Sequence, residues 1–471
     1  MHIDCLAAYQ SLDQKTVDTL LKQEAEKSNR KIVVLDDDPT GVQTVHDISV
    51  YTDWSLDSIR AGFAEDNKLF FILTNSRGFT VEQTTKAHTV IAERVSQVAA
   101  ENHMDYLIIS RGDSTLRGHY PLETELLREK AEEHNSWKMD GEILCPYFRE
   151  GGRYTLNNVH YVKYGEELVP AGQTEFAGDE TFGYKASNLC EYIEEKTKGA
   201  FRKEDCICIS LESIRAMDID GIEAQLETAE NFQKIIVNAI DDYDVKVFSI
   251  ALYRAMAKGY HYTIRCAAAL VKALGNISNK QLLTRDEMVT LKASTGGIIV
   301  VGSHTKKTTA QLEELKKLEQ ISFLEMDSDL VLQNGALEQE VKRLIDVEEE
   351  KLQAGITVCI STKRAVLTVE NDTPEKALLR SVAISDAVQS LVGRLYVVPA
   401  FVVAKGGITS SDVGTKALQV KCAKVLGQIQ PGIPVWQTGA ESRFPGTPYV
   451  IFPGNVGDVD TLRKAVEILL P

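Results

Sequence analysis

The segment KIVVLDDDPTG, residues 31–41, is a short apolar run that ends in three carboxylates and a turn. β-Branched and apolar residues followed by Asp, Pro and Gly predict a buried strand and then a tight loop. In a parallel sheet, ligands bind at the carboxyl ends of the strands. The end of this strand, with Asp36, Asp37 and Asp38, is therefore a candidate binding site.

Short apolar runs alternate with longer amphipathic segments along the rest of the chain, which predicts strands joined by crossover helices. In residues 81–100, Val90, Ile91, Val95 and Val98 form an apolar stripe that predicts a helix packed on a sheet. The expected strands are 31–35, 48–52, 69–74, 106–110, 143–146, 207–210, 234–239, 298–301, 323–326, 356–360, 398–404, a strand at Val435, and 449–452.

The chain has 471 residues, more than one hydrophobic core usually spans, so two domains are expected. The polar stretch 276–294 precedes a second alternating series and predicts domains at 1–275 and 295–471. The expected fold class is α/β, with a mainly parallel sheet flanked by helices in each domain and the active site in the cleft between them. The Gly- and Tyr-rich stretch 141–182 is expected to be an irregular loop.

The formal net charge of −16 disfavours binding to nucleic acids or anionic membrane surfaces, because the overall field repels phosphate groups. No stretch resembles a signal peptide or a membrane span, so a cytoplasmic protein is expected. The closest pair of the 8 cysteines, Cys206 and Cys208, is too tightly spaced for a Cys-x-x-Cys site. Reduced thiols that fill core space are expected.

Two further polar loops follow expected strands of the first half, 75–78 (NSRG) and 111–118 (RGDSTLRG). Carboxylates can accept hydrogen bonds from sugar hydroxyls or remove a proton, and an Arg fork matches a carboxylate. Each loop alone is more readily explained by turns and surface ion pairs. Three such loops at successive strand ends instead predict a site for a small hydroxylated acid.

Three Gly-containing loops follow expected strands of the second half, at 302–307, 405–411 and 453–458. Glycines allow close approach of a phosphate, and the free amides of a helix amino terminus can hold it. Neither a P-loop nor a dinucleotide-binding fingerprint is present. His304 is more readily a capping or exposed residue than a catalytic one.

Together these loops resemble the four-carbon acid sugar kinase family. The family's Asp-Asp-x-Thr-Gly motif is matched by Asp37, Asp38, Thr40 and Gly41, and its Ser-Arg loop by Ser76 and Arg77. Its Lys-x-Asp-Ser-Thr-Leu-Arg-Gly motif is matched at 111–118. In the second half, the family's loops are matched by Gly302-Ser303, by 406–409, and by 454–457, which includes Asn455.

The resemblance implies transfer of the γ-phosphoryl group of ATP, with Mg²⁺, to the terminal hydroxyl of a threonate, erythronate or oxo-tetronate. The residues that it implies for the acid are Asp37, Asp38, Arg77, Arg111, Gly112, Asp113 and Ser114. Those that it implies for ATP are Ser303, Gly406, Gly407, Ile408, Thr409 and Gly454. Asp37 is the expected base and Asp113 the second candidate, and no metal ligands are assigned.

Two positions depart from the family's pattern. Arg111 replaces the usual Lys, and Ile408 occupies a position that is often acidic. The alternative functions are a sugar-acid and nucleotide binding protein or sensor without catalysis, and a kinase-like protein without ATP turnover. The acceptor's stereochemistry stays open, and a homo-oligomer is compatible with the sequence.

Overall fold

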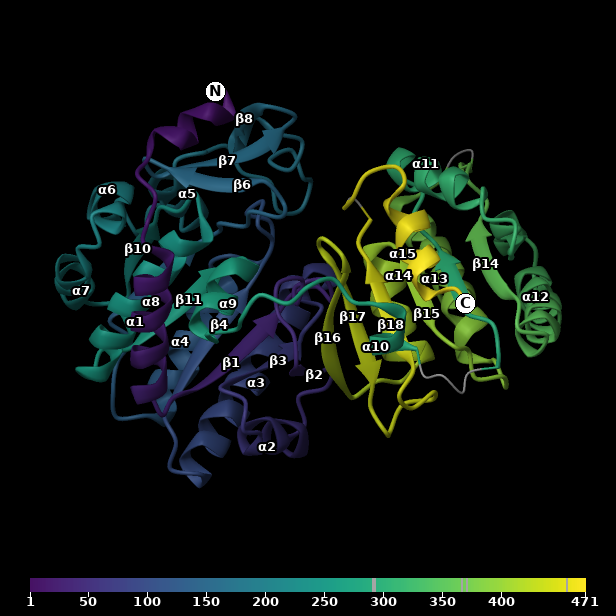
Figure 1. The fold of residues 1–471 in the computed structure, drawn as a ribbon, viewed down its shortest axis with the longest axis horizontal. Coiled ribbons are helices and arrows are strands. Elements are labelled where there is room, and N and C mark those ends of the chain that lie inside the picture. Colours follow the sequence, from purple (N-terminus) through teal and green to yellow (C-terminus); the bar gives the residue numbers. More distant parts are fainter. Residues whose placement is uncertain (290–293, 366, 370–371, 455) are drawn as a thin grey trace. The chain divides into compact units, whose positions relative to one another are not determined.

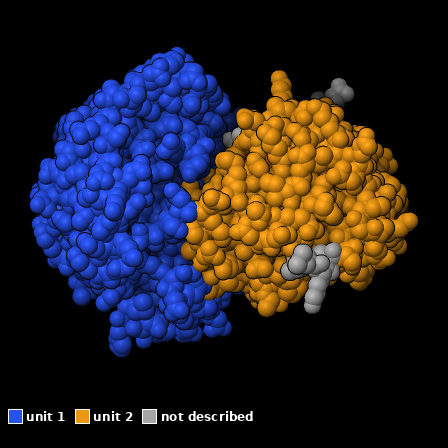
Figure 2. Space-filling view, in the orientation of Figure 1, with its two compact units in different colours: residues 1–41, 53–279 blue, residues 42–52, 280–471 orange. Residues whose placement is uncertain are grey.

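The computed structural model describes residues 1–289, 294–365, 367–369, 372–454 and 456–471, with an α/β fold throughout (Figure 1). Two compact units are formed, one from residues 1–41 and 53–279 and one from residues 42–52 and 280–471 (Figure 2). Residues 42–52 thus pack with the second half of the chain. The polar stretch 276–294 is only partly described, because residues 290–293 lie outside these ranges.

The main sheet of unit 1 is parallel. Its strands, in spatial order, are β3 (Leu69–Leu73), β1 (Lys31–Asp36), β4 (Tyr106–Arg111), β11 (Tyr262–Cys266), β5 (Gly141–Cys145), β10 (Gln233–Val237) and β9 (Ile207–Ile209). Every residue of β1 is buried, as expected for a central strand that is covered on both faces.

The helices of unit 1 form two groups. Helix α8 contacts α1, α7 and α9, and helix α3 contacts α2 and α4. Helix α1 lies beside α8 in Figure 1. The helices and 3₁₀ turns are η1 (Ile3–Ala8), α1 (Gln14–Lys27), α2 (Leu56–Ala64), η2 (Ser76–Gly78), α3 (Val81–Glu101), α4 (Leu122–His134), η3 (Ala171–Gln173), α5 (Leu189–Lys196), η4 (Lys203–Asp205), α6 (Leu211–Arg215), α7 (Ile219–Glu227), α8 (Asp242–Ala257) and α9 (Ala268–Leu274). Helix α3 begins at a Thr80–Gln83 capping box. It buries Ile91, Val95 and Val98 of the predicted stripe, whereas Val90 is only partly buried.

The expected irregular loop at 141–182 is wrong. Apart from β5, which corresponds to the strand expected at 143–146, it contains an antiparallel sheet of β6 (Arg153–Leu156), β7 (Val159–Tyr164) and β8 (Glu167–Pro170). Asn157 and Asn158 have φ values of 50° and 64°, which suit a tight hairpin turn between β6 and β7. The polar composition of this stretch reflects a small sheet with turns.

The sheet of unit 2 is mixed, with parallel strands from β13 to β18 and antiparallel pairing beyond β18. The strands, in spatial order, are β13 (Ile321–Met326), β14 (Thr357–Thr362), β12 (Ile298–Val301), β15 (Val402–Lys405), β18 (Pro448–Phe452), β17 (Ile433–Thr438), β16 (Cys422–Gln430) and β2 (Ile48–Tyr51). Val301, Val403 and Val450 lie together in the core of this unit.

The helices of unit 2 also form two groups, in which α11 contacts α15 and α13 contacts α12 and α14. They are α10 (Arg285–Met288), α11 (Lys306–Leu315), η5 (Ser328–Leu332), α12 (Ala336–Gln353), α13 (Pro374–Gly393), α14 (Gly407–Asp412), the π-helical η6 (Val413–Ala417) and α15 (Thr461–Leu469). The fold is therefore α/β with mostly parallel sheets flanked by helices, as predicted.

The expected strand 398–404 is too long, since only Val402–Lys405 is a strand. Pro399 lacks an amide hydrogen and cannot donate a ladder hydrogen bond. Strands β11 and β16 are absent from the sequence prediction. The domain limits 1–275 and 295–471, and an active site in a cleft between the domains, stay predictions.

Candidate functional site

The predicted loops of the first half meet at one edge of the sheet of unit 1. Strand β1 pairs with β3 on one side and with β4 on the other, and Asp36 is opposite Leu73 and Arg111. Because the three strands are parallel, the loops that follow them emerge side by side. Asp37, Arg77 and Arg111 are therefore brought together, as the sequence predicts.

Arg77 holds two of the carboxylates at the end of β1. Its Nη2 and Nε donate to Oδ1 and Oδ2 of Asp37 at 2.6 and 3.2 Å, and its Nη1 donates to Oδ2 of Asp38 at 3.2 Å. Burial raises the pKa of Asp37, although Arg77, Arg265 and Arg111 oppose that rise. Burial acts in the same direction on Asp38, but Arg77 and Thr40 outweigh it and lower the pKa of Asp38.

Asp36 lies deeper and has a different partner. Nη1 of Arg111 donates to Oδ1 of Asp36 at 3.1 Å, and burial raises the pKa of Asp36 to about 7. A Cβ atom on Gly41 would lie 1.9 Å from Oδ2 of Asp36, so this position in the turn needs glycine. Arg111, which stands where the family usually has Lys, thus forms ion pairs with carboxylates of β1 and of the loop after it.

A buried Arg265–Glu123 pair, missed by sequence reasoning, lies behind the loops. Nη1 of Arg265 donates to Oε2 of Glu123 at 2.6 Å and to Oγ of Ser110 at 2.8 Å, and Ser76 donates to Oε1 of Glu123 at 2.7 Å. A Cβ on Gly112 would lie 2.1 Å from Cζ of Arg265. Gly112 therefore makes room for the Arg265 guanidinium. The missed signal is the alternation of Tyr262, Ile264 and Cys266, which predicts a strand that carries this arginine.

The 111–118 loop is held in an unusual backbone shape. Leu116 has a φ of 68°, which is rare for a residue with a bulky side chain. Tyr184 and Tyr192 donate to the carbonyl oxygens of Thr115 and Leu116 at 2.7 and 2.9 Å. His160 Nε2 lies 2.8 Å from the carbonyl oxygen of Ser114.

Within this loop, Asp113 is paired with Arg117, whose Nε donates to its Oδ2 at 2.7 Å. Burial alone would raise the pKa of Asp113, but Arg77, Arg117 and Thr115 hold it well below its ordinary value. Asp113 is therefore a weaker base than Asp37, and Ser114 beside it is also buried.

The predicted loops of the second half meet at the carboxyl edge of the sheet of unit 2. Strand β15 lies between β12 and β18, so the loops after all three adjoin. Thr308 donates to Oγ of Ser303 at 3.1 Å and to the carbonyl oxygen of Gly454 at 3.3 Å. A Cβ on Gly302 would lie 2.3 Å from Oγ1 of Thr409.

Gly406 shapes the middle loop, because its φ of 123° is rare for other residues and its Cβ position lies 3.1 Å from Cβ of Ser303. Gly407 begins helix α14, and Ile408 beside it is 74% exposed. Asp412, the last residue of α14, accepts from Ser385 at 2.6 Å and pairs with Lys416 at 3.2 Å. Asn455 of the third loop lies outside the described residues.

The buried Lys405, the first residue of the 405–411 loop, has a supporting role that the sequence does not predict. Nζ of Lys405 donates to the carbonyl oxygens of Pro453 and Gly454 at 2.5 and 3.0 Å. Burial lowers the pKa of Lys405 to about 7. His304, by contrast, has Nε2 3.2 Å from Oγ1 of Thr362 in an exposed loop.

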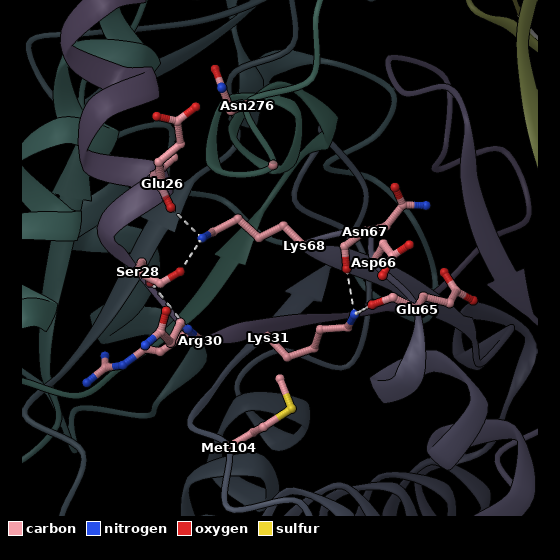
Figure 3. A pocket seen from close by; sticks show the side chains of 13 residues that line it. Glu26, Ser28, Arg30, Lys31, Glu65, Asp66, Asn67, Lys68, Met104 and Asn276 are labelled. Atoms are coloured by element: carbon pink, nitrogen blue, oxygen red, sulfur yellow. Dashed lines mark hydrogen bonds between the residues drawn. The ribbon is translucent and has the colours of Figure 1, made fainter.

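A pocket of about 350 Å³ in unit 1 lies away from these loops, at the start of β1 and β3 (Figure 3). Its two lysines donate to main-chain oxygens, Lys31 to those of Glu65 and Asn67 and Lys68 to those of Ala25 and Ser28. Both ammonium groups therefore hydrogen-bond to the main chain near the points where a helix connects to the next strand. The pocket lies at the amino-terminal edge of the sheet, away from the edge where parallel sheets bind ligands.

The described residues contain no group of three or more His, Cys, Asp or Glu side chains arranged to hold a metal ion. Four of the eight cysteines, Cys145, Cys190, Cys266 and Cys359, are buried thiols, whereas Cys5, Cys206, Cys208 and Cys422 are only partly buried. Over the part of the chain that the structure describes, no helix combines the length and apolar character required to cross a bilayer.

Comparisons with known proteins assign a domain type to each half of the chain. Residues 32–274 match the model of a sugar-binding N-terminal domain, and residues 298–462 match that of a nucleotide-binding C-terminal domain. The chain is therefore a protein with a sugar-binding and a nucleotide-binding domain. It belongs to the four-carbon acid sugar kinase family.

Two solved structures share the fold. Haemophilus influenzae protein HI1011, with family model DUF1537, is 16% identical with a TM-score of 0.59, over 93% of this chain and 100% of that one. A protein of Salmonella typhimurium LT2, described as a "putative tRNA synthase", is 14% identical with a TM-score of 0.68, over 92% of this chain and 98% of that one. A search of curated proteins found no match.

Proposed function

We propose that this protein is an ATP-dependent kinase that phosphorylates the terminal hydroxyl of a four-carbon sugar acid of the threonate, erythronate or oxo-tetronate type. The observation that carries the proposal is Asp37, a buried carboxylate of raised pKa at the end of β1 in a domain that matches sugar-binding domains. A base of raised pKa removes a hydroxyl proton more readily near neutral pH.

In the proposed reaction, the acceptor's terminal hydroxyl loses its proton to a carboxylate oxygen of Asp37 as its oxygen attacks the γ-phosphorus of ATP. Arg77 holds the Asp37 carboxylate in one orientation through two hydrogen bonds, at 2.6 and 3.2 Å. Fixed orientation of the reacting groups lowers the entropic cost of reaching the transition state. The remaining product is ADP, which leaves with the negative charge of the broken P–O bond.

For the nucleotide, Ser303, Gly406, Gly407, Ile408, Thr409 and Gly454 are the proposed contacts. Gly302, Ser303 and Thr409 lie close together, so a phosphate bound there meets main-chain amides and two hydroxyl groups. The oxygen donors available suit Mg²⁺, which would be held mainly by ATP oxygens and water. When bound, the ion neutralises charge between the β and γ phosphates.

The test is a coupled assay of ADP release with ATP and Mg²⁺ across both enantiomers of threonate and erythronate and the oxo-tetronates. Production of ADP together with a phosphorylated acid is expected for at least one of them. Saturable binding of an acid and of ATP without ADP release would instead favour the non-catalytic binding protein. Absence of both binding and turnover for every acid would overturn the proposed substrate class.

A further inference from the structure

Four arginines near the strand ends of unit 1 are already paired with carboxylates of the protein. Arg77 holds Asp37 and Asp38, Arg111 holds Asp36, Arg117 holds Asp113, and Arg265 holds Glu123. An arginine recognises a ligand carboxylate best when its fork is free for two parallel hydrogen bonds. These four are therefore poorly placed to recognise an additional carboxylate without giving up an internal partner.

Arg153, the first residue of β6, differs from them. Its guanidinium lies 5.5 Å from the centre of the Phe176 ring, and that of Arg117 lies 5.1 Å from the same ring. Its Nε is shielded from solvent and has no hydrogen-bond partner. Within the described residues, no carboxylate forms an ion pair with Arg153.

The polar groups around Arg153 are already satisfied by other partners. Asp113 is bonded to Arg117, Tyr164 donates to Glu175 at 2.5 Å, and His160 lies between Thr155 and Ser114 at 3.0 and 2.8 Å. Burial lowers the pKa of His160 to about 4, so this ring stays neutral. None of these groups supplies a negative charge directly to the Arg153 fork.

A partly buried guanidinium without a counter-ion is unfavourable, because it loses hydration without gaining an ion pair. Burial lowers the pKa of Arg153, the charge of Arg117 adds to this effect, and the nearby Asp113, Tyr164 and Glu175 oppose it. Arg153 thus lies within electrostatic range of a predicted substrate-binding residue. A small anion bound beside the 111–118 loop would supply the counter-charge that Arg153 lacks.

We propose that Arg153 binds the carboxylate of the acid sugar, and that Arg77 acts as a positioning residue for Asp37 and Asp38. This differs from the sequence prediction, in which Arg77 itself contacts the acid. The inference rests on the proposed function, since it assumes a sugar acid as the acceptor. It assigns acid recognition to the small sheet formed by β6, β7 and β8.

The first test is calorimetric titration without nucleotide, with threonate and erythronate in both enantiomers and with the corresponding amides as uncharged probes. Wild-type protein should bind an acid more tightly than its amide. Arg153→Met should weaken binding of the acid by about 30-fold to 1,000-fold, as expected when one member of a buried charge pair is removed. Binding of the amide should stay within about threefold, since it carries no charge to pair.

Arg149→Met is the matched control, because the Arg149 side chain is 59% exposed and pairs with Asp241 outside this cluster. It should bind both probes as the wild type does. Unchanged acid binding in Arg153→Met, or an equal loss of affinity for the acid and the amide, would overturn the assignment of Arg153 but not the proposed substrate class. If the wild type binds none of the acids, both this inference and the proposed substrate class are overturned.

A second measurement uses wild-type protein and so does not depend on folding of a variant. Phenylglyoxal modifies accessible arginines, and peptide mapping by mass spectrometry reports the rate at each one. With the acid at ten times its Kd, the modification rate of Arg153 should fall by about tenfold, following the unliganded fraction. Equal modification rates of Arg153 with and without the acid would refute its role. Arg149, the control, should be modified at the same rate in both conditions.

Discussion

Replacing Gly302 with alanine tests whether the loops of unit 2 hold the nucleotide. The new Cβ would lie 2.3 Å from Oγ1 of Thr409, whereas ordinary contacts begin at 3.4 Å. Its other two near contacts, to Cβ and Cγ2 of Thr409, are ordinary at 3.4 and 3.5 Å. The conflict is therefore confined to one hydroxyl oxygen, which has to move by about 1 Å.

The size of the effect follows from this overlap. Extra atoms in a well-packed site cost about 1–3 kcal/mol, which corresponds to about 5- to 150-fold in affinity. Because Thr409 and Ser303 are proposed ATP contacts, the loss should appear in the Kd of ATP. Binding of the acid, assigned to the other domain, should not change.

The control is the same change in a Thr409→Ala background, where the clashing oxygen is gone. There Gly302→Ala should change ATP affinity by less than about threefold relative to Thr409→Ala alone. Titration with ATP measures the Kd of each variant. The reasoning fails if Gly302→Ala binds ATP like the wild type, or if it loses affinity for the acid by the same factor as for ATP.

Three further changes probe the site and the fold. Asp37→Asn should lower kcat by about 10²- to 10⁴-fold with ATP affinity retained, and an intact kcat with weakened acid binding would make Asp37 a substrate anchor. Arg265→Met leaves Glu123 buried without its partner, so thermal unfolding should show a loss of about 3–5 kcal/mol, and an unchanged Tm would contradict this. Glu348 is fully buried, and in the described structure neither of its carboxylate oxygens has a hydrogen-bond partner. Burial raises its pKa from 4.5 to about 9, so the free energy of unfolding falls as pH rises between these values. Glu348→Gln should therefore add about 3 kcal/mol at pH 7 and little at pH 4.5, which urea unfolding at both pH values can check.

The loops at β1, β3 and β4 could be predicted because the signal for each is local. An apolar run predicts each strand, and the rule for parallel sheets places the residues after it at one edge. Asp37, Arg77 and Arg111 meet there as expected. What the rule does not predict is that these residues pair with one another.

Arg265 and Lys405 could not be predicted in the same way, because their partners are distant in sequence. Arg265 belongs to a fully buried strand, and its carboxylate partner Glu123 is 142 residues away. Lys405 ends an apolar strand, and its Nζ donates to the carbonyl oxygens of Pro453 and Gly454. Only the assembled sheet brings such partners together.

The four acidic side chains at the strand ends of unit 1 are made chemically different by their surroundings. Asp38 and Asp113 have lowered pKa values, since Thr40 and Thr115 hydrogen bonds add to arginine charges, and both stay ionised as fixed negative charges. Asp36 and Asp37 have raised pKa values, because burial outweighs their arginines. When environment separates carboxylates in this way, the one of raised pKa is the natural base. Asp36 is packed against Gly41 beneath the turn, so Asp37 is the carboxylate of raised pKa that we expect to accept the substrate's proton.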